Sequence, residues 1–181
     1  MNAAKKRIYL DHAATSWPKS ADVLDAMDRF ARECGAAAGR GGYRSAAEAD
    51  RIVTQVRRQI GNLIGAASAD CISLHSNGTA ALNSAIHGFV RPGDHVVTSA
   101  AEHNSVLRPL HFLEQHQHVR LTVIPTDEGG LVDVDRLLEA VTDQTRLVAL
   151  THASNVTGAI QPIEDVGTAL QNRPALVLCD A

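Results

Sequence analysis

Short apolar runs alternate with stretches of helical periodicity from residue 71 onward, and this alternation limits the possible folds more than any other feature. The expected strands are 71–75, 95–99, 120–125, 146–151 and 175–179, and the expected helices between them are 79–89, 105–117, 133–141 and 163–172. Strands that are joined through helices cross over the sheet, so neighbouring strands run parallel. The pattern predicts an α/β fold with a mostly parallel sheet flanked by helices.

Two further helices are expected before this alternation, over 21–34 and 45–64. The second helix carries apolar residues at helical spacing along its length, and this stripe is expected to pack into the core. The sequence thus predicts an N-terminal helical segment over 1–44, followed by a larger domain over 45–181. The apolar content of 45% is sufficient for a hydrophobic core.

Charge and cysteine usage narrow the classes of partner and compartment. The net charge of −3 gives no electrostatic case for nucleic-acid binding. The basic residues at the start are not followed by a long apolar run, so neither a signal peptide nor a membrane span is expected. Cys34, Cys71 and Cys179 form no CxxC spacing, which favours a reduced, cytoplasmic compartment. Cys71 and Cys179 lie in apolar runs and are expected to be buried.

The segment from Cys71 to Gly88 reads as a strand, a turn of small residues and a helix. A helix N-terminus offers unpaired N–H groups and a partial positive charge, which suits a phosphate group. In that interpretation Gly78 lets an anion approach the backbone, and the Thr79 hydroxyl adds a donor. An ordinary strand-to-helix turn, with Asn77 or Thr79 as the N-cap residue, explains the same residues equally well.

Polar residues follow three of the other predicted strands. His103 comes after 95–99, Asn155 comes after 146–151, and Asp180 ends the last strand. Ligands of open α/β sheets bind at the carboxyl ends of the strands, so these side chains are expected at one edge. Singly, His103 could cap a helix, Asn155 could form a turn and Asp180 could be a surface carboxylate. Together with the phosphate-type turn, they suit a flat, phosphorylated pyridine.

These residues resemble the cysteine desulfurase branch of the class V aminotransferase family, whose members use pyridoxal 5'-phosphate (PLP). The resemblance runs the whole length of the chain through matching segments in the family's order. The segments are Tyr9–Ser16, Gly39–Gly42, Ser76–Asn83, Glu102–Leu107, Asn155–Gly158 and Cys179–Ala181. The family removes sulfur from L-cysteine and leaves alanine and a persulfide on an enzyme cysteine. Its members are homodimers, and the sulfur can pass to an acceptor protein.

The resemblance implies a role for each cofactor-binding position. Gly78 and Thr79 would hold the phosphate, and His103 would stack on the pyridine ring as the catalytic histidine. Asn155 would face the phenolic oxygen or the substrate, and Asp180 would pair with the ring nitrogen.

Two positions nearer the N-terminus match family segments on the substrate side. These positions are His12 and Arg40. The resemblance implies that both contribute, with Asn155, to binding the substrate.

The sequence also departs from the family. Its lysines are Lys5, Lys6 and Lys19, and none follows a predicted strand at the site, so none is assigned as the Schiff-base lysine. None of its cysteines matches the position of the family's nucleophilic cysteine. Ala80 stands where the family often has an acidic residue. The chain is therefore expected to be the cofactor-binding N-terminal half, to bind PLP weakly at best, and to be inactive by itself.

Other interpretations remain open at this level. The same segments fit another class V PLP enzyme, such as an aminotransferase or a selenocysteine lyase. A truncated, non-catalytic module that associates with a partner is also consistent with the sequence. A metal site is not expected, because the spacing of His111, His116 and His118 matches no standard zinc pattern.

Overall fold

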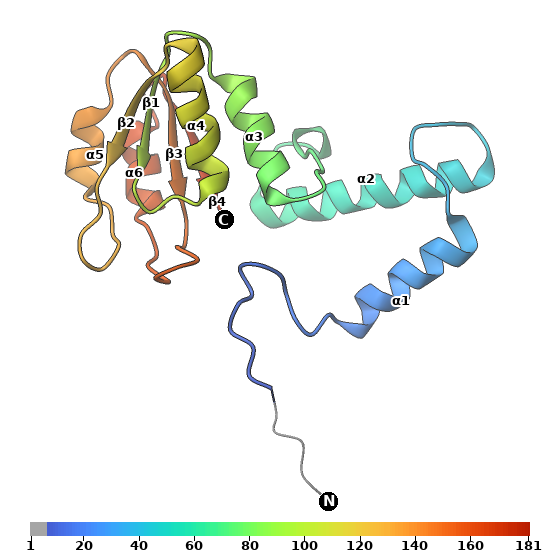
Figure 1. The fold of residues 1–181 in the computed structure, drawn as a ribbon. Coiled ribbons are helices and arrows are strands. Elements are labelled where there is room, and N and C mark those ends of the chain that lie inside the picture. Colours follow the sequence, from blue (N-terminus) through green and yellow to red (C-terminus); the bar gives the residue numbers. More distant parts are fainter. Residues whose placement is uncertain (1–6) are drawn as a thin grey trace, which may run out of the picture. The chain divides into compact units, whose positions relative to one another are not determined.

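The computed structural model describes residues 7–181, which divide into two compact units between Leu74 and His75 (Figure 1). The first unit contains helix α1 (Ala21–Arg29), which continues as a π-helical turn (Phe30–Cys34), and helix α2 (Arg44–Ile64). The predicted domain boundary at 44/45 falls after the first residue of α2, whereas the boundary between compact units lies after the whole helix. Each unit is described by itself.

The second unit contains a four-stranded sheet in the order β2-β1-β3-β4. All neighbouring strands pair in parallel, which confirms the predicted sheet. The strands are β1 (His95–Ser99), β2 (Arg120–Ile124), β3 (Thr145–Thr151) and β4 (Leu176–Asp180). The helices of this unit are α3 (Gly78–Phe89), α4 (Asn104–Gln117), α5 (Val134–Ala140) and α6 (Ile163–Leu170).

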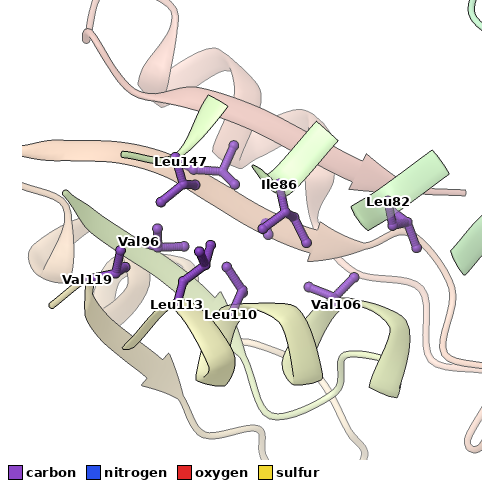
Figure 2. Packing of buried hydrophobic residues seen from close by; sticks show 10 residues of the cluster. Leu82, Ile86, Val96, Val106, Leu110, Leu113, Val119 and Leu147 are labelled. Atoms are coloured by element: carbon purple, nitrogen blue, oxygen red, sulfur yellow. The ribbon is translucent and has the colours of Figure 1, made fainter. Parts of the chain in front are cut away.

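Helices cover both faces of the sheet because the central strands are apolar on both sides. Val96 of β1 belongs to the buried cluster under α3 and α4, whereas its neighbour Val97 belongs to the cluster under α5 and α6. This alternation follows from the two-residue period of a strand. Figure 2 shows the first cluster, where Ile86 of α3 and Leu110 of α4 converge with Val96.

The predicted strand 71–75 is wrong. Residues 69–71 form a 3₁₀ turn, and the chain runs on to α3 without regular structure. Ile72 is buried and the isoleucine side chain lies near Gly61 of α2, so its apolar character serves packing within the first unit. A strand needs a neighbouring strand to satisfy its backbone groups, and the sheet of the second unit consists of the four later strands.

The apolar stripe of α2 is less buried than predicted. Ala49 is buried, but Ile52 is 38% exposed and Leu63 is 84% exposed. The turns of the first unit that pack on α2 lie near its two ends: Cys34 Sγ donates to the Ser45 carbonyl at 3.2 Å, and the 3₁₀ turn follows its last residues. The middle of the stripe is therefore only partly covered. Among residues 7–181, no helix combines the length and apolar character that a membrane crossing requires.

His95 opens β1 and joins it to both neighbouring strands. Its ring is buried, with Nδ1 2.9 Å from the Thr145 hydroxyl of β3 and Nε2 2.9 Å from the Thr122 hydroxyl of β2. Burial, and then the positive charge of Arg120, lower the pKa of His95 below its ordinary value of 6.5. The neutral imidazole is thus the form that the folded protein favours.

We expect the free energy of unfolding to fall as the pH drops below 6.5, because the unfolded chain then binds a proton that folded His95 resists. A lowered folded pKa means that this contribution is complete above 6.5 and is lost as the pH falls through the folded value. Urea denaturation of wild type and His95→Gln on both sides of that pH isolates the effect. His111→Gln, a change at an exposed histidine, serves as the control. If the difference in unfolding free energy between wild type and His95→Gln were constant with pH, the expectation would be contradicted.

Candidate functional site

The candidate site lies at the carboxyl edge of the sheet, where the strand order reverses. The chain leaves β1 through α4 to reach β2 on one side, and then crosses back through α5 to β3 on the other side. The carboxyl ends of β1 and β3 therefore diverge into loops on opposite sides. Such a reversal point opens the crevice in which α/β sheets bind their ligands.

Helix α3 presents its N-terminus as the sequence predicts, and the N-cap interpretation is also correct. The Asn77 side chain accepts a hydrogen bond from the Ala80 N–H at 2.8 Å, and the Asn77 carbonyl accepts from the Ala81 N–H. The N–H groups of Gly78 and Thr79 precede this first intrahelical bond. A Cβ added to Gly78 would meet no atom within 4 Å, so the first turn has open space beside its backbone.

A chain of hydrogen bonds joins α3 to His103. Thr79 Oγ1 lies 2.8 Å from Ser105 Oγ, which lies 2.8 Å from His103 Nδ1. His103 is also the N-cap of α4, because its Nδ1 accepts from the Ser105 N–H at 3.1 Å. The helix-capping explanation of His103 is thus correct. Ser105 also links the His103 ring to Thr79, the residue predicted to bind the phosphate.

Pro109 explains a second contact between these helices. Proline lacks an N–H, so the carbonyl of Ser105, four residues earlier, has no donor from its own helix. Asn83 of α3 fills this role, with its Nδ2 3.4 Å from the Ser105 carbonyl and 2.9 Å from the Thr79 carbonyl. Pro109 itself is buried, and α4 continues through it to Gln117.

Glu102 bridges the diverging ends of β1 and β3. It is 7% exposed, and its Oε1 accepts from the Ser99 hydroxyl at 2.6 Å and from the Thr151 N–H at 2.9 Å. Its Oε2 is buried and has no hydrogen-bond partner among the described residues. Burial is the main cause that raises the pKa of Glu102 above its ordinary value, and the charge of Asp180 adds to it, against the two hydrogen bonds.

Asp180 stands at the end of β4, beside the end of β3. It pairs in register with Thr151, and its carbonyl accepts from the His152 N–H at 2.7 Å. The side chain is half-buried. Asp180 is therefore adjacent to the strand end that Glu102 holds.

Asn155 lies in the loop that follows β3 and is exposed. The loop is built around Ser154, which is buried and whose hydroxyl accepts from the N–H groups of Val156 and Thr157, both at 3.2 Å. Gly158 closes the loop with a positive φ of 76°, a conformation that favours glycine. Asn155 thus follows β3, the strand that neighbours that of Asp180.

A groove of about 530 Å³ runs between α3 and α4. Both helix starts contribute to it, through Thr79 on one side and His103 on the other. Its lining residues are Thr79, Asn83, His87, His103, Asn104, Ser105, Arg108, Pro109 and Phe112.

His12 and Arg40 belong to the first unit, and both are exposed. The ring of His12 contacts Tyr9 edge to face, with 5.0 Å between the ring centroids. Their predicted roles in substrate binding stay predictions.

The predicted burial of two cysteines is wrong, since Cys71 and Cys179 are exposed and only Cys34 is half-buried. Cys71 is exposed because 71–75 is no strand, and Cys179 because β4 is an edge strand paired only with β3. Partial desolvation, and then the charges of Asp180 and Glu102, raise the pKa of the Cys179 thiol. A raised pKa leaves less thiolate at neutral pH, so Cys179 is not activated as a nucleophile.

The donor set suits a phosphorylated aromatic base. The N-terminus of α3 and the Thr79 hydroxyl match an anion, His103 offers a ring, and Asp180 offers a carboxylate. Sequence reasoning missed Ser105 and Asn83, whose contacts arise from the packing of α3 on α4. Within residues 7–181, no three His, Cys, Asp or Glu side chains are grouped so as to hold a metal ion.

Comparisons with known proteins bear on the family and the fold of this chain. The class-V aminotransferase family model matches residues 8–181. A probable cysteine desulfurase of Methanothermobacter thermautotrophicus is 37% identical over 98% of this chain and 44% of its own length, and a cysteine desulfurase IscS of Dictyoglomus turgidum is 36% identical over 90% and 41%.

Solved structures share the fold. A NifS-like protein has a TM-score of 0.86 at 28% identity, covering 97% of this chain and 48% of its own. SspA in complex with cysteine has a TM-score of 0.84 at 27% identity, covering 96% and 50%. The chain thus spans less than half the length of the curated relatives named above. With the family model matched over nearly all of its length, the chain belongs to the class-V aminotransferase family.

Proposed function

We propose that this chain is the cofactor-binding half of a PLP-dependent cysteine desulfurase, which converts L-cysteine to L-alanine and transfers the sulfur to an enzyme cysteine. The observation that carries the proposal is the hydrogen-bonded link from Thr79, at the open N-terminus of α3, through Ser105 to His103 in a class-V chain. Asp180 ends a strand of the same sheet. The named relatives are cysteine desulfurases, which favours this activity over other reactions of the family.

The residues present fit PLP. The phosphate would take the first turn of α3, with Gly78 giving backbone access and the Thr79 hydroxyl a further hydrogen bond. When bound, PLP supplies an electron-withdrawing pyridine ring that stabilises negative charge on carbon. Asp180 would hold a proton on the ring nitrogen, and Asn155 would donate to the phenolic oxygen or the substrate.

His103 is placed to act in acid–base catalysis and carries a proton that it can donate. Its Nδ1 accepts from the Ser105 N–H, so in the neutral ring the proton sits on Nε2. Nε2 is therefore the atom from which His103 can donate a proton, and the exposed ring can stack on the cofactor.

The remaining catalytic groups are proposed to lie in the part of the relatives that this chain does not span. Lys19, the one lysine in residues 7–181, is tied to Thr15 and Ser16 by hydrogen bonds in the first unit. Cys34 donates to a backbone carbonyl, and the Cys179 thiol has a raised pKa. None of these side chains is proposed as the cofactor-linking lysine or the sulfur-accepting cysteine.

The substrate and partners follow from the same proposal. One solved relative, SspA, is in complex with cysteine, which supports L-cysteine as the substrate. A homodimer and a sulfur-acceptor protein are proposed for the whole enzyme. The three free cysteines suit a reducing compartment, which we propose is the cytoplasm.

We expect the purified chain to bind PLP reversibly, and Thr79→Val to weaken this binding about tenfold, the size expected for one hydrogen bond to a charged phosphate. Valine keeps the shape of threonine, so the loss reports the hydroxyl. Thr168→Val, an exposed threonine on α6, is the matched control. Affinity is measured by titration of PLP absorbance and by calorimetry. No saturable binding by the wild-type chain would overturn the proposal.

Borohydride reduction completes this experiment. We expect the reduced cofactor to be lost on dialysis, because Lys19 is held in the first unit by its own hydrogen bonds. We likewise expect no alanine or sulfide from L-cysteine and PLP with this chain alone. Cofactor that stays bound after reduction and dialysis would show that a lysine of this chain reaches it, and would contradict the division of catalytic groups proposed above.

A further inference from the structure

Ser105 is only 7% exposed, and each of its polar groups has a hydrogen-bond partner. Its N–H donates to His103 Nδ1, and its carbonyl accepts from Asn83 because Pro109 supplies no donor. Its hydroxyl lies 2.8 Å from both Thr79 Oγ1 and His103 Nδ1. Ser105 is therefore fixed at the junction of α3 and α4.

The direction of these hydrogen bonds follows from the backbone. His103 Nδ1 accepts from the Ser105 N–H, so it carries no proton in the neutral ring. The Ser105 hydroxyl must then donate its one hydrogen to Nδ1, and its oxygen must accept from the Thr79 hydroxyl. Three groups form a directed chain that runs from Thr79 through Ser105 to His103.

We propose that Ser105 is a positioning residue that couples the phosphate-binding hydroxyl of Thr79 to the ring of His103. Thr79 has one hydroxyl hydrogen, and donating it to an anion turns it away from Ser105. The Ser105 oxygen then loses its donor, which changes the hydrogen bond that Ser105 gives to Nδ1. The chain of contacts thereby transmits phosphate occupancy to His103. This coupling rests on the proposed function for the identity of the anion.

A double-mutant cycle without ligand tests the coupling directly. The readout is the ¹⁵N chemical shift of His103 Nδ1 in the purified chain. We expect Thr79→Val to move this signal in the wild-type background and to leave it unmoved in the Ser105→Ala background. Ser105→Thr keeps a hydroxyl and is expected to restore the response. A Thr79→Val effect of the same size in both backgrounds would overturn the proposal.

The tautomer of His103 distinguishes a coupling role of Ser105 from a merely structural one. The backbone N–H at position 105 survives Ser105→Ala, so we expect the proton of His103 to stay on Nε2 in that variant while the response to Thr79→Val is lost. Ser84→Ala, an exposed serine on α3, is the matched control and should behave as wild type. A switch of the His103 proton to Nδ1 in Ser105→Ala would contradict the directed chain.

Inorganic phosphate, added to the same samples, distinguishes this inference from the proposed function. We expect phosphate to shift the amide signals of Gly78 and Thr79, and to move His103 Nδ1 in wild type but not in Ser105→Ala. Unmoved amides at Gly78 and Thr79 would count against the phosphate site of the proposed function, while the ligand-free cycle still decides the coupling. Moved amides with an equal His103 response in both proteins would overturn the coupling alone.

Discussion

Replacing Glu102 with alanine is expected to lower the free energy of unfolding by about 3 kcal/mol, because two buried donors lose their acceptor. The donors are the Ser99 hydroxyl and the Thr151 N–H, at the ends of β1 and β3. A loss of that size is a large fraction of the ~5–15 kcal/mol that stabilises an ordinary domain. Urea denaturation followed by circular dichroism measures it. Glu139→Ala removes an exposed carboxyl on α5 and is the control.

Glutamine at position 102 separates the hydrogen bonds from the charge. Its amide oxygen can still accept from Ser99 and Thr151, so we expect Glu102→Gln to cost much less than Glu102→Ala. The folded pKa of Glu102 is raised above 4.5, so its contribution to stability is complete below that value and is lost as the pH rises through the folded value. The stability of wild type relative to Glu102→Gln should therefore fall as the pH rises. A constant difference would refute the role assigned to burial.

Leu110→Ala is expected to lower the free energy of unfolding by about 2–5 kcal/mol, the range for large-to-small changes in a packed core. Leu110 is fully buried between α4, α3 and the sheet, where Ile86 and Val96 surround it (Figure 2). Little room exists for these neighbours to close the cavity, because they come from two different elements, α3 and β1.

The control for this change is Leu131→Ala, which removes the same atoms from a side chain that is 42% exposed. Thermal and urea denaturation of both variants give the comparison, and we expect the Leu131 variant to stay close to wild type. Equal losses of unfolding free energy in the two variants would show that the buried cluster under α3 and α4 is not the core of the second unit.

The sequence allowed most of the second unit to be predicted because its two central strands, β1 and β3, are buried on both faces. The predicted run 95–99 coincides with β1, whose residues are all buried, and the predicted helix 79–89 differs from α3 by one residue. The run 71–75 has similar composition but is not a strand. Apolar character alone does not distinguish a strand from a connection, because strand pairing depends on residues distant in the sequence.

Only part of the candidate site could be predicted from the sequence, namely the residues whose position next to a helix or strand marks them as candidates. His103 and Asp180 were identifiable as candidates because one follows a strand and the other ends one, and parallel strands bring such positions to one edge. Gly78 was identifiable because it begins a helix. Ser105 was not identifiable, because its partner Thr79 lies 26 residues away on another helix. The bridge from Glu102 to Thr151, 49 residues apart, was hidden for the same reason.

The two buried clusters that hold the sheet contain none of the residues proposed to bind the cofactor. Thr79, Asn155 and Asp180 stand on a helix start, a loop and a strand end instead, supported by a scaffold that does not depend on them. Evolution can therefore exchange such residues one at a time without unfolding the protein. This separation gives a physical reason why a single class-V scaffold can carry more than one kind of site.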